Sequence, residues 1–163
     1  MIVTSCIESL IIADDFNPDI SSLILNNSLI SLKRIEIGND CFENVSRFVI
    51  DGLNELETII IEEGSFTLDD ENSRGSSCLI MNCDQLSEIH IEDWSFYWYE
   101  SFECKNLPSL ISIQLDGYSF YACHLIVWMI EWMMNEIWFE LNPSFLYMML
   151  YMVMKIVLIG LNW

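Results

Sequence analysis

The chain has 163 residues, which is enough for one domain with a sizeable core. Its 25 acidic and 6 basic residues leave a formal net charge of −19. This charge argues against nucleic acid and against a bare anionic membrane surface as partners, because phosphate binding needs clustered Lys and Arg. An acidic surface instead attracts cations and basic proteins.

A short phrase recurs along the chain: an apolar residue, two variable residues, an apolar one, a variable one and an apolar one. Four residues later a Ser-Phe or Cys-Phe pair follows each clear copy. The clear copies are 32–37, 56–61, 86–91 and 110–115, and a weaker copy begins at Ile7. The clear copies start 24, 30 and 24 residues apart. Repeats of this period are typical of stacked solenoids.

Each phrase predicts one short β-strand, because its residues 1, 4 and 6 point to one side while residues 3 and 5 point to the other. Successive strands must stack in parallel, since a full turn of the coil separates them. The segments 48–50, 78–80 and 102–104 alternate as well, which predicts a second short strand on the return half of each turn. The Phe residues that end the phrases are expected to form an aromatic ladder: Phe42, Phe66, Phe96 and Phe120.

The third turn carries six extra residues within 67–77, a polar stretch that predicts a surface loop. Insertions in solenoids can mark the face that binds a partner, but they also accumulate where the fold tolerates them. If the loop takes part in binding, Asp69, Asp70 and Glu71 are its candidate contact residues.

These features resemble the leucine-rich repeat family over about residues 7–121. The Ser/Cys-Phe pair and the segment 82–86 are more similar to the BspA-type repeats of bacterial surface proteins and protists. The resemblance implies a β-rich, right-handed solenoid of about five repeats, with a parallel sheet and short second strands on the return face. It also implies a protein-binding role. The Asn or Cys that usually follows the last strand aliphatic is absent, so hydrogen bonding in the outer turn must differ.

Residues 122–163 differ in composition from the repeats. Four of the six Trp and seven of the nine Met lie beyond residue 121, and a degenerate sixth phrase can be placed at 134–139. Residues 144–163 are nearly all apolar, with Lys155 as their only charge, and we expect them to be helical. Three interpretations stay open: a membrane anchor, a cap over the end of the solenoid, or the translation of Asp-rich repeat DNA in a shifted frame.

The outer face of the predicted sheet is the candidate binding surface. The residue that directly follows each phrase, which we count as position 7, brings Glu62, Glu92 and Asp116 into one row, about 5 Å apart. Like charges placed opposite each other destabilise a sheet, so a basic peptide or a cation could relieve them. A solvated acidic rim is the alternative. The predicted contact residues are Glu36, Ile60, Glu62, His90, Glu92, Gln114 and Asp116.

The sequence predicts no catalytic residue, metal site or cofactor. His90 lies among acids, but no Ser or Cys nucleophile has an evident spatial relation to it. The cysteines lack zinc-site spacing, and residues 69–72 lack calcium-loop spacing. The predicted function is therefore non-catalytic binding of a protein with a basic surface. The alternatives are a membrane-anchored or structural fragment of a larger array, and a β-helix-type enzyme with raised carboxylate pKa values.

The cysteines favour a reducing compartment. Cys41, Cys78, Cys83 and Cys104 fall at or beside apolar repeat positions, where a free thiol behaves as a small hydrophobe. The first residues lack the basic segment of a secretory signal. We therefore expect a cytoplasmic location, with membrane association through 144–163 left open.

Overall fold

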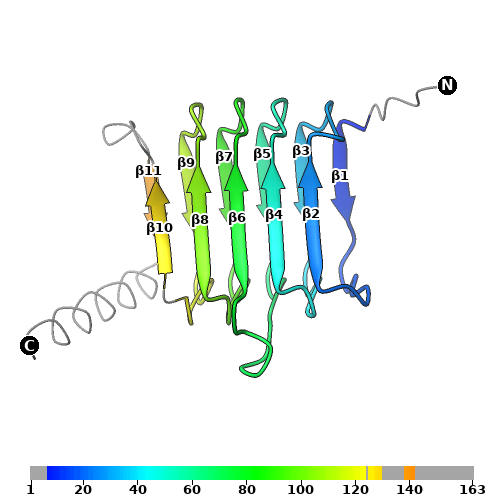
Figure 1. Ribbon diagram of the computed structural model, residues 1–163, viewed down its shortest axis with the longest axis vertical. Helices are drawn as coiled ribbons and strands as arrows, with labels where there is room; N and C mark the ends of the chain where they lie inside the picture. The colour runs from blue at the N-terminus through cyan, green and yellow to red at the C-terminus, as the bar shows by residue number, and fades with distance from the viewer. Residues whose placement is uncertain (1–6, 124, 130–137, 142–163) are drawn as a thin grey trace, which may run out of the picture.

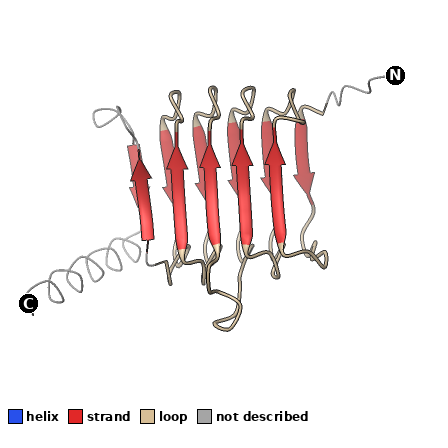
Figure 2. Cartoon of the chain, viewed as in Figure 1, coloured by secondary structure: helices blue, strands red, loops and turns tan. Residues whose placement is uncertain are grey.

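The protein, a computed structural model that describes residues 7–123, 125–129 and 138–141, is a β-solenoid. Each turn of the chain places one strand in each of two facing parallel sheets (Figure 1). All regular elements in the described ranges are strands (Figure 2). The predicted solenoid of parallel strands, with a second strand on each return, is confirmed.

The two sheets alternate along the chain. The first, sheet A, runs in the order β1 Ser9–Ile12, β3 Arg34–Ile37, β5 Thr58–Ile61, β7 Glu88–Ile91, β9 Ser112–Leu115 and β11 Trp138–Leu141. The second, sheet B, contains β2 Ser22–Asn26, β4 Arg47–Asp51, β6 Ser77–Met81, β8 Ser101–Lys105 and β10 Leu125–Met129. All neighbouring strands pair in parallel, because each strand follows a complete turn.

The strand register follows the sequence phrase. Residues 4 and 6 of each phrase align across sheet A and are buried: Ile35, Ile59, Ile89 and Ile113 form one row, and Ile37, Ile61, Ile91 and Leu115 form the next. Aliphatic burial of this kind is the main stabilising term of such a fold.

Cysteines share the opposite side of the core. Cys78 of β6 and Cys104 of β8 point inward from sheet B, and Cys83 lies in the turn that follows β6. All three are buried free thiols, as the sequence predicted. Burial raises the pKa of the Cys83 thiol to about 11, which keeps it protonated at neutral pH.

The predicted aromatic ladder is present at the turn from sheet A to sheet B. Phe66 and Phe96 stack with ring centroids 4.7 Å apart, and Phe96 and Phe120 with centroids 4.8 Å apart. Phe42 continues the ladder at 5.1 Å from Phe66. Each of these residues has a positive φ, between 53° and 58°. A left-handed conformation costs a non-glycine residue about 1–2 kcal/mol, so ring burial and stacking must offset it at every turn.

Ser hydroxyl groups join successive turns of the solenoid beside the aromatic ladder. The Ser65 hydroxyl donates to the Gly38 carbonyl at 2.7 Å and accepts the Cys41 backbone N–H at 3.0 Å. The Ser95 hydroxyl, one turn later, donates to the Glu62 carbonyl at 2.8 Å. Ser65 and Ser95 thus satisfy backbone groups of the preceding turn, which explains why these residues are small and polar, whereas the Ser119 hydroxyl donates to the Asp116 carbonyl of its own turn at 2.6 Å.

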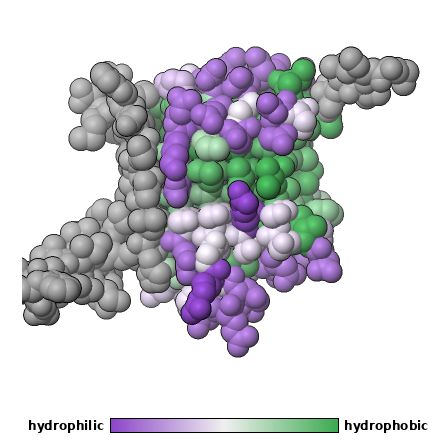
Figure 3. Space-filling view, viewed as in Figure 1, coloured by the Kyte–Doolittle hydropathy of each residue, from purple (hydrophilic) through white to green (hydrophobic). Residues whose placement is uncertain are grey.

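The expected loop at 67–77 joins β5 to β6 and extends beyond the other turns at the lower edge of Figure 1. Outside the loop, the outer face of sheet B is partly apolar. Ile24, Val49 and Leu79 align across β2, β4 and β6, and apolar side chains gather over these strands in Figure 3.

The sixth phrase lies two residues later than the sequence placed it. Phe139 pairs with Ile113, and Leu141 pairs with Leu115, so these two occupy positions 4 and 6 of the phrase. The placement at 134–139 was wrong because almost every register of this apolar segment looks hydrophobic. The segment 144–163 lies outside the described residues, so its predicted helix, its three interpretations and the domain boundary at 121 stay predictions. Among the described residues, no helix has the length and apolar character needed to span a bilayer.

Candidate functional site

The structure places four of the predicted contact residues in one row on the outer face of sheet A. Glu36, Ile60, His90 and Gln114 are paired neighbours across β3, β5, β7 and β9, and all four are half-buried. The row therefore combines an acid, an aliphatic side chain, an imidazole and an amide at fixed strand spacing.

The other three predicted residues form a carboxylate row at the ends of these strands. The backbone N–H groups of Glu62, Glu92 and Asp116 each donate to a carbonyl of the preceding turn at 2.9 Å, which continues the strand ladder. Partial burial raises the pKa of Glu62, and the charges of Glu92, Asp14 and Glu36 raise it further. The expected stacking of like charges is thus present.

Polar contacts orient both rows. Arg34 pairs with Glu36 at 2.8 Å, and the Asn39 amide donates to Glu62 at 3.1 Å. His90 Nε2 lies 3.1 Å from Asp116 Oδ2, and the Gln114 amide lies 3.2 Å from both Asp116 oxygens. The imidazole and the amide hold the Asp116 carboxylate in place, whereas no such pair of side-chain contacts among the described residues joins Glu62 to Glu92.

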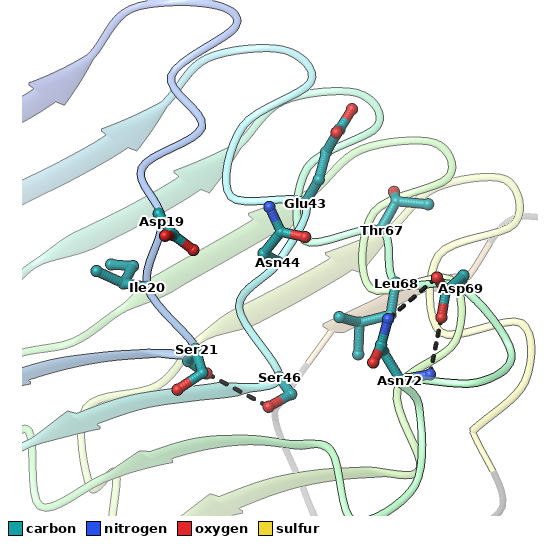
Figure 4. Close-up of a pocket in the computed structure, with 10 residues that line it drawn as sticks. All are labelled: Asp19, Ile20, Ser21, Glu43, Asn44, Ser46, Thr67, Leu68, Asp69 and Asn72. Carbon is teal, nitrogen blue, oxygen red and sulfur yellow. Dashed lines mark hydrogen bonds between the residues drawn. The ribbon is translucent and has the colours of Figure 1, made fainter.

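The loop residues differ from one another in their contacts. The Asp69 carboxylate accepts the Asn72 backbone N–H at 2.7 Å and the Asn72 side-chain amide at 3.0 Å (Figure 4), so it closes the loop on itself. Asp70 and Glu71 are exposed. The loop, the segment at Asp19 and the turn at Glu43 enclose a hollow of about 500 Å³ (Figure 4).

An exposed group of aromatic side chains lies at the same edge of the solenoid and was missed at the level of sequence. Trp94, Tyr97, Tyr118 and Tyr121 lie in the two turns that follow β7 and β9. A signal was available, because Trp94 and Tyr118 recur three residues after the last aliphatic residue of their phrases, and Tyr97 and Tyr121 recur three residues further on.

Nothing in the described ranges places three or more His, Cys, Asp or Glu side chains where they could hold a metal ion. Comparison with protein-family models, curated proteins and solved structures finds no match to this chain.

Proposed function

We propose that the chain is a non-catalytic recognition module that binds a basic protein on the outer face of sheet A. The observation that carries this proposal is the carboxylate row of Glu62, Glu92 and Asp116 at the ends of three neighbouring strands, where burial and then the charge of Glu92 raise the pKa of Glu62. A partner that supplies Lys or Arg side chains would relieve this repulsion, so binding would recover free energy that the isolated protein cannot.

The neighbouring row adds shape and apolar contact. Ile60 lies between Glu36 and His90 in the strand register, so an aliphatic side chain is flanked by two polar ones. The parallel strands hold both rows rigidly, which lowers the ordering cost of binding. The net charge of −19 also favours rapid encounter with a basic partner. Asp70 and Glu71 extend the proposed contact surface, while Asp69 shapes the loop.

Binding of a hexalysine peptide at low and moderate salt tests the proposal. The double variant Glu62→Gln with Glu92→Gln should weaken binding about 3- to 30-fold, since each rim charge contributes a few tenths to about 1 kcal/mol. The control is Glu55→Gln with Asp84→Asn, which removes the same charge from exposed turns at the opposite edge. Equal losses in the two variants would show that only net charge matters and would overturn the proposed site.

We propose no catalytic role for the pair His90 and Asp116. Acid–base or nucleophilic catalysis needs a reacting group next to the imidazole, whereas here the imidazole and the Gln114 amide share one carboxylate on an open sheet. The variant His90→Gln should therefore retain hexalysine binding within about 3-fold, because Gln can still donate to Asp116. We also propose a cytoplasmic location, which buried free thiols at Cys78, Cys83 and Cys104 support.

A further inference from the structure

Three exposed rings and the half-buried ring of Tyr97 form a compact aromatic array at the turn edge. Trp94 stacks on Tyr118 with centroids 4.4 Å apart, and Tyr97 stacks on Tyr121 with centroids 5.0 Å apart. Trp94 also lies 5.3 Å from Tyr97, so the two stacks are joined. Exposed Trp and Tyr side chains are the types most often found at the centre of protein-binding surfaces.

The array ends abruptly one turn earlier. In that turn, Gly64 occupies the position equivalent to Trp94, and Thr67 occupies the position equivalent to Tyr97. The two residues flank Phe66 of the buried ladder in the sequence. Gly64 has a φ of 73°, but Asp40 and Trp94 hold the same conformation with side chains, at 53° and 63°. The glycine is therefore not required by the backbone. The Trp94 ring stacks on Tyr118 and Tyr97, yet Trp94 stays 43% exposed and borders a hollow beside Gly64.

A hollow of about 440 Å³, which we name the slot, occupies this gap. Trp94, Gly64 and Thr67 line it together with three acidic residues. The lining residues are Asn39, Asp40, Glu43, Glu63, Gly64, Thr67 and Trp94. Asp40 leans over the glycine, since a Cβ on Gly64 would lie 2.3 Å from Asp40 Oδ1. The slot thus combines one aromatic face with three carboxylates: those of Asp40, Glu43 and Glu63.

We propose that the slot binds an arginine side chain of the basic partner; this inference rests on the proposed function and names the residue that the partner inserts. The turn of Gly64 lies between those of Asp40 and Trp94 and carries no side chain at Gly64, so a planar group that enters the slot would meet the Asp40 carboxylate and the indole. A guanidinium can stack on the indole while its fork of N–H groups donates to the carboxylates. A lysine ammonium is more strongly hydrated and cannot stack as a plane, so arginine fits the slot better.

The slot also continues the strand face. Glu62 of the carboxylate row is followed directly by Glu63 and Gly64 of the slot. One extended basic segment could therefore place a lysine or arginine on the carboxylate row and an arginine in the slot at the same time.

Two peptides of equal length and charge test the inference: hexalysine and the same peptide with two central arginines. The wild-type protein should bind the arginine peptide about 3- to 10-fold more tightly, as expected for a cation–π contact with partial desolvation. Thr67→Tyr should erase this preference, because the new ring extends the row of Tyr97 and Tyr121 into the slot. Thr67 is not at a positive φ, so the tyrosine meets no backbone strain. Trp94→Leu should erase the preference from the opposite wall.

The matched control is Tyr121→Leu, which removes an exposed ring that does not line the slot and should keep the preference. Cooperative thermal unfolding of each variant establishes that it is folded. Equal affinity of the wild type for both peptides, or a preference that survives in Thr67→Tyr, would overturn the slot. Competition by a neutral oligosaccharide for the arginine peptide would overturn it as well, in favour of a sugar-binding platform.

A separate variant tests the carboxylate row of Glu62, Glu92 and Asp116. Glu62→Gln with Glu92→Gln should weaken both peptides by the same factor and leave the arginine preference intact. Loss of preference without loss of hexalysine binding would therefore sink the slot alone. Unchanged hexalysine binding in the double glutamine variant would sink the proposed function alone.

Discussion

Two sets of stacked aromatic rings lie in the same turns of this solenoid, and they differ in burial. The inner ladder of Phe42, Phe66, Phe96 and Phe120 is at most 3% exposed. In the outer array, Trp94, Tyr118 and Tyr121 are 42–46% exposed. Both stacks have the spacing of one strand, because both are carried by the same backbone repeat. The same geometry therefore stabilises the fold where it is dry and offers a binding surface where it is wet.

The largest expected effect comes from breaking the inner ladder. Phe96→Ala should lower the free energy of unfolding by about 3–5 kcal/mol, since it removes a fully buried ring that stacks on two neighbours. Tyr121→Ala, the outer counterpart, should cost less than about 1 kcal/mol because its ring is already half in water. Urea denaturation of both variants measures the contrast. Similar losses would mean that the outer array belongs to the core energetically.

Removing a buried Ser hydroxyl should have the next largest effect on the free energy of unfolding. Ser95→Ala removes the buried donor to the Glu62 carbonyl and should cost about 1–3 kcal/mol. Ser95→Cys should cost less, because Cys41 occupies the equivalent place in its own turn and its thiol donates to the Ala13 carbonyl at 3.2 Å. Thermal or urea unfolding of the pair decides the matter. A cysteine variant as unstable as the alanine variant would show that size, and not hydrogen bonding, governs this position.

Adding a ring to the outer array should change stability less than removing a ring from the inner ladder. Thr67→Tyr adds a ring in line with Tyr97 and Tyr121 and should change stability by no more than about 1 kcal/mol, with stacking offsetting the lost hydroxyl contacts. Its effect on arginine binding should be much larger than its effect on folding. A loss of several kcal/mol in unfolding free energy would show that Thr67 is a structural residue of the turn.

The smallest expected effect is a pH dependence at the carboxylate row. The pKa of Glu62 is raised above its ordinary value of 4.5, so the folded protein holds this proton more tightly than the unfolded chain. Protonation of Glu62 thus favours folding below that value, and this contribution is lost as pH rises through the raised pKa. Glu62→Gln should stabilise the protein at pH 7 by about 0.2–1 kcal/mol. The gain should vanish near pH 4, and unfolding curves at both pH values measure it. A gain that is equal at both values would contradict the charge explanation.

Much of the fold could be predicted from the phrase itself. Alternation in 32–37 and its copies determined which residues face the core, and equal spacing determined that they align, so the rows of Ile35 and Ile37 and the Phe ladder followed. The row that contains Glu36, Ile60, His90 and Gln114 was predictable for the same reason. The sixth phrase was not, because an alternation argument needs polar residues to mark the outer face, and residues 122–163 hold few.

The sequence by itself therefore determined the repeat, the strands and the composition of each face, since these depend on local alternation and on period. Only the tertiary structure decided that the Ser65 and Ser95 hydroxyls join successive turns, that Phe residues adopt positive φ, and that Asp69 closes its own loop. It also decided that the aromatic array stops at Gly64 and opens a slot beside three carboxylates. The hydroxyl contacts and the slot arise between turns about 25 residues apart in the chain, where stacking joins side chains that no local pattern relates.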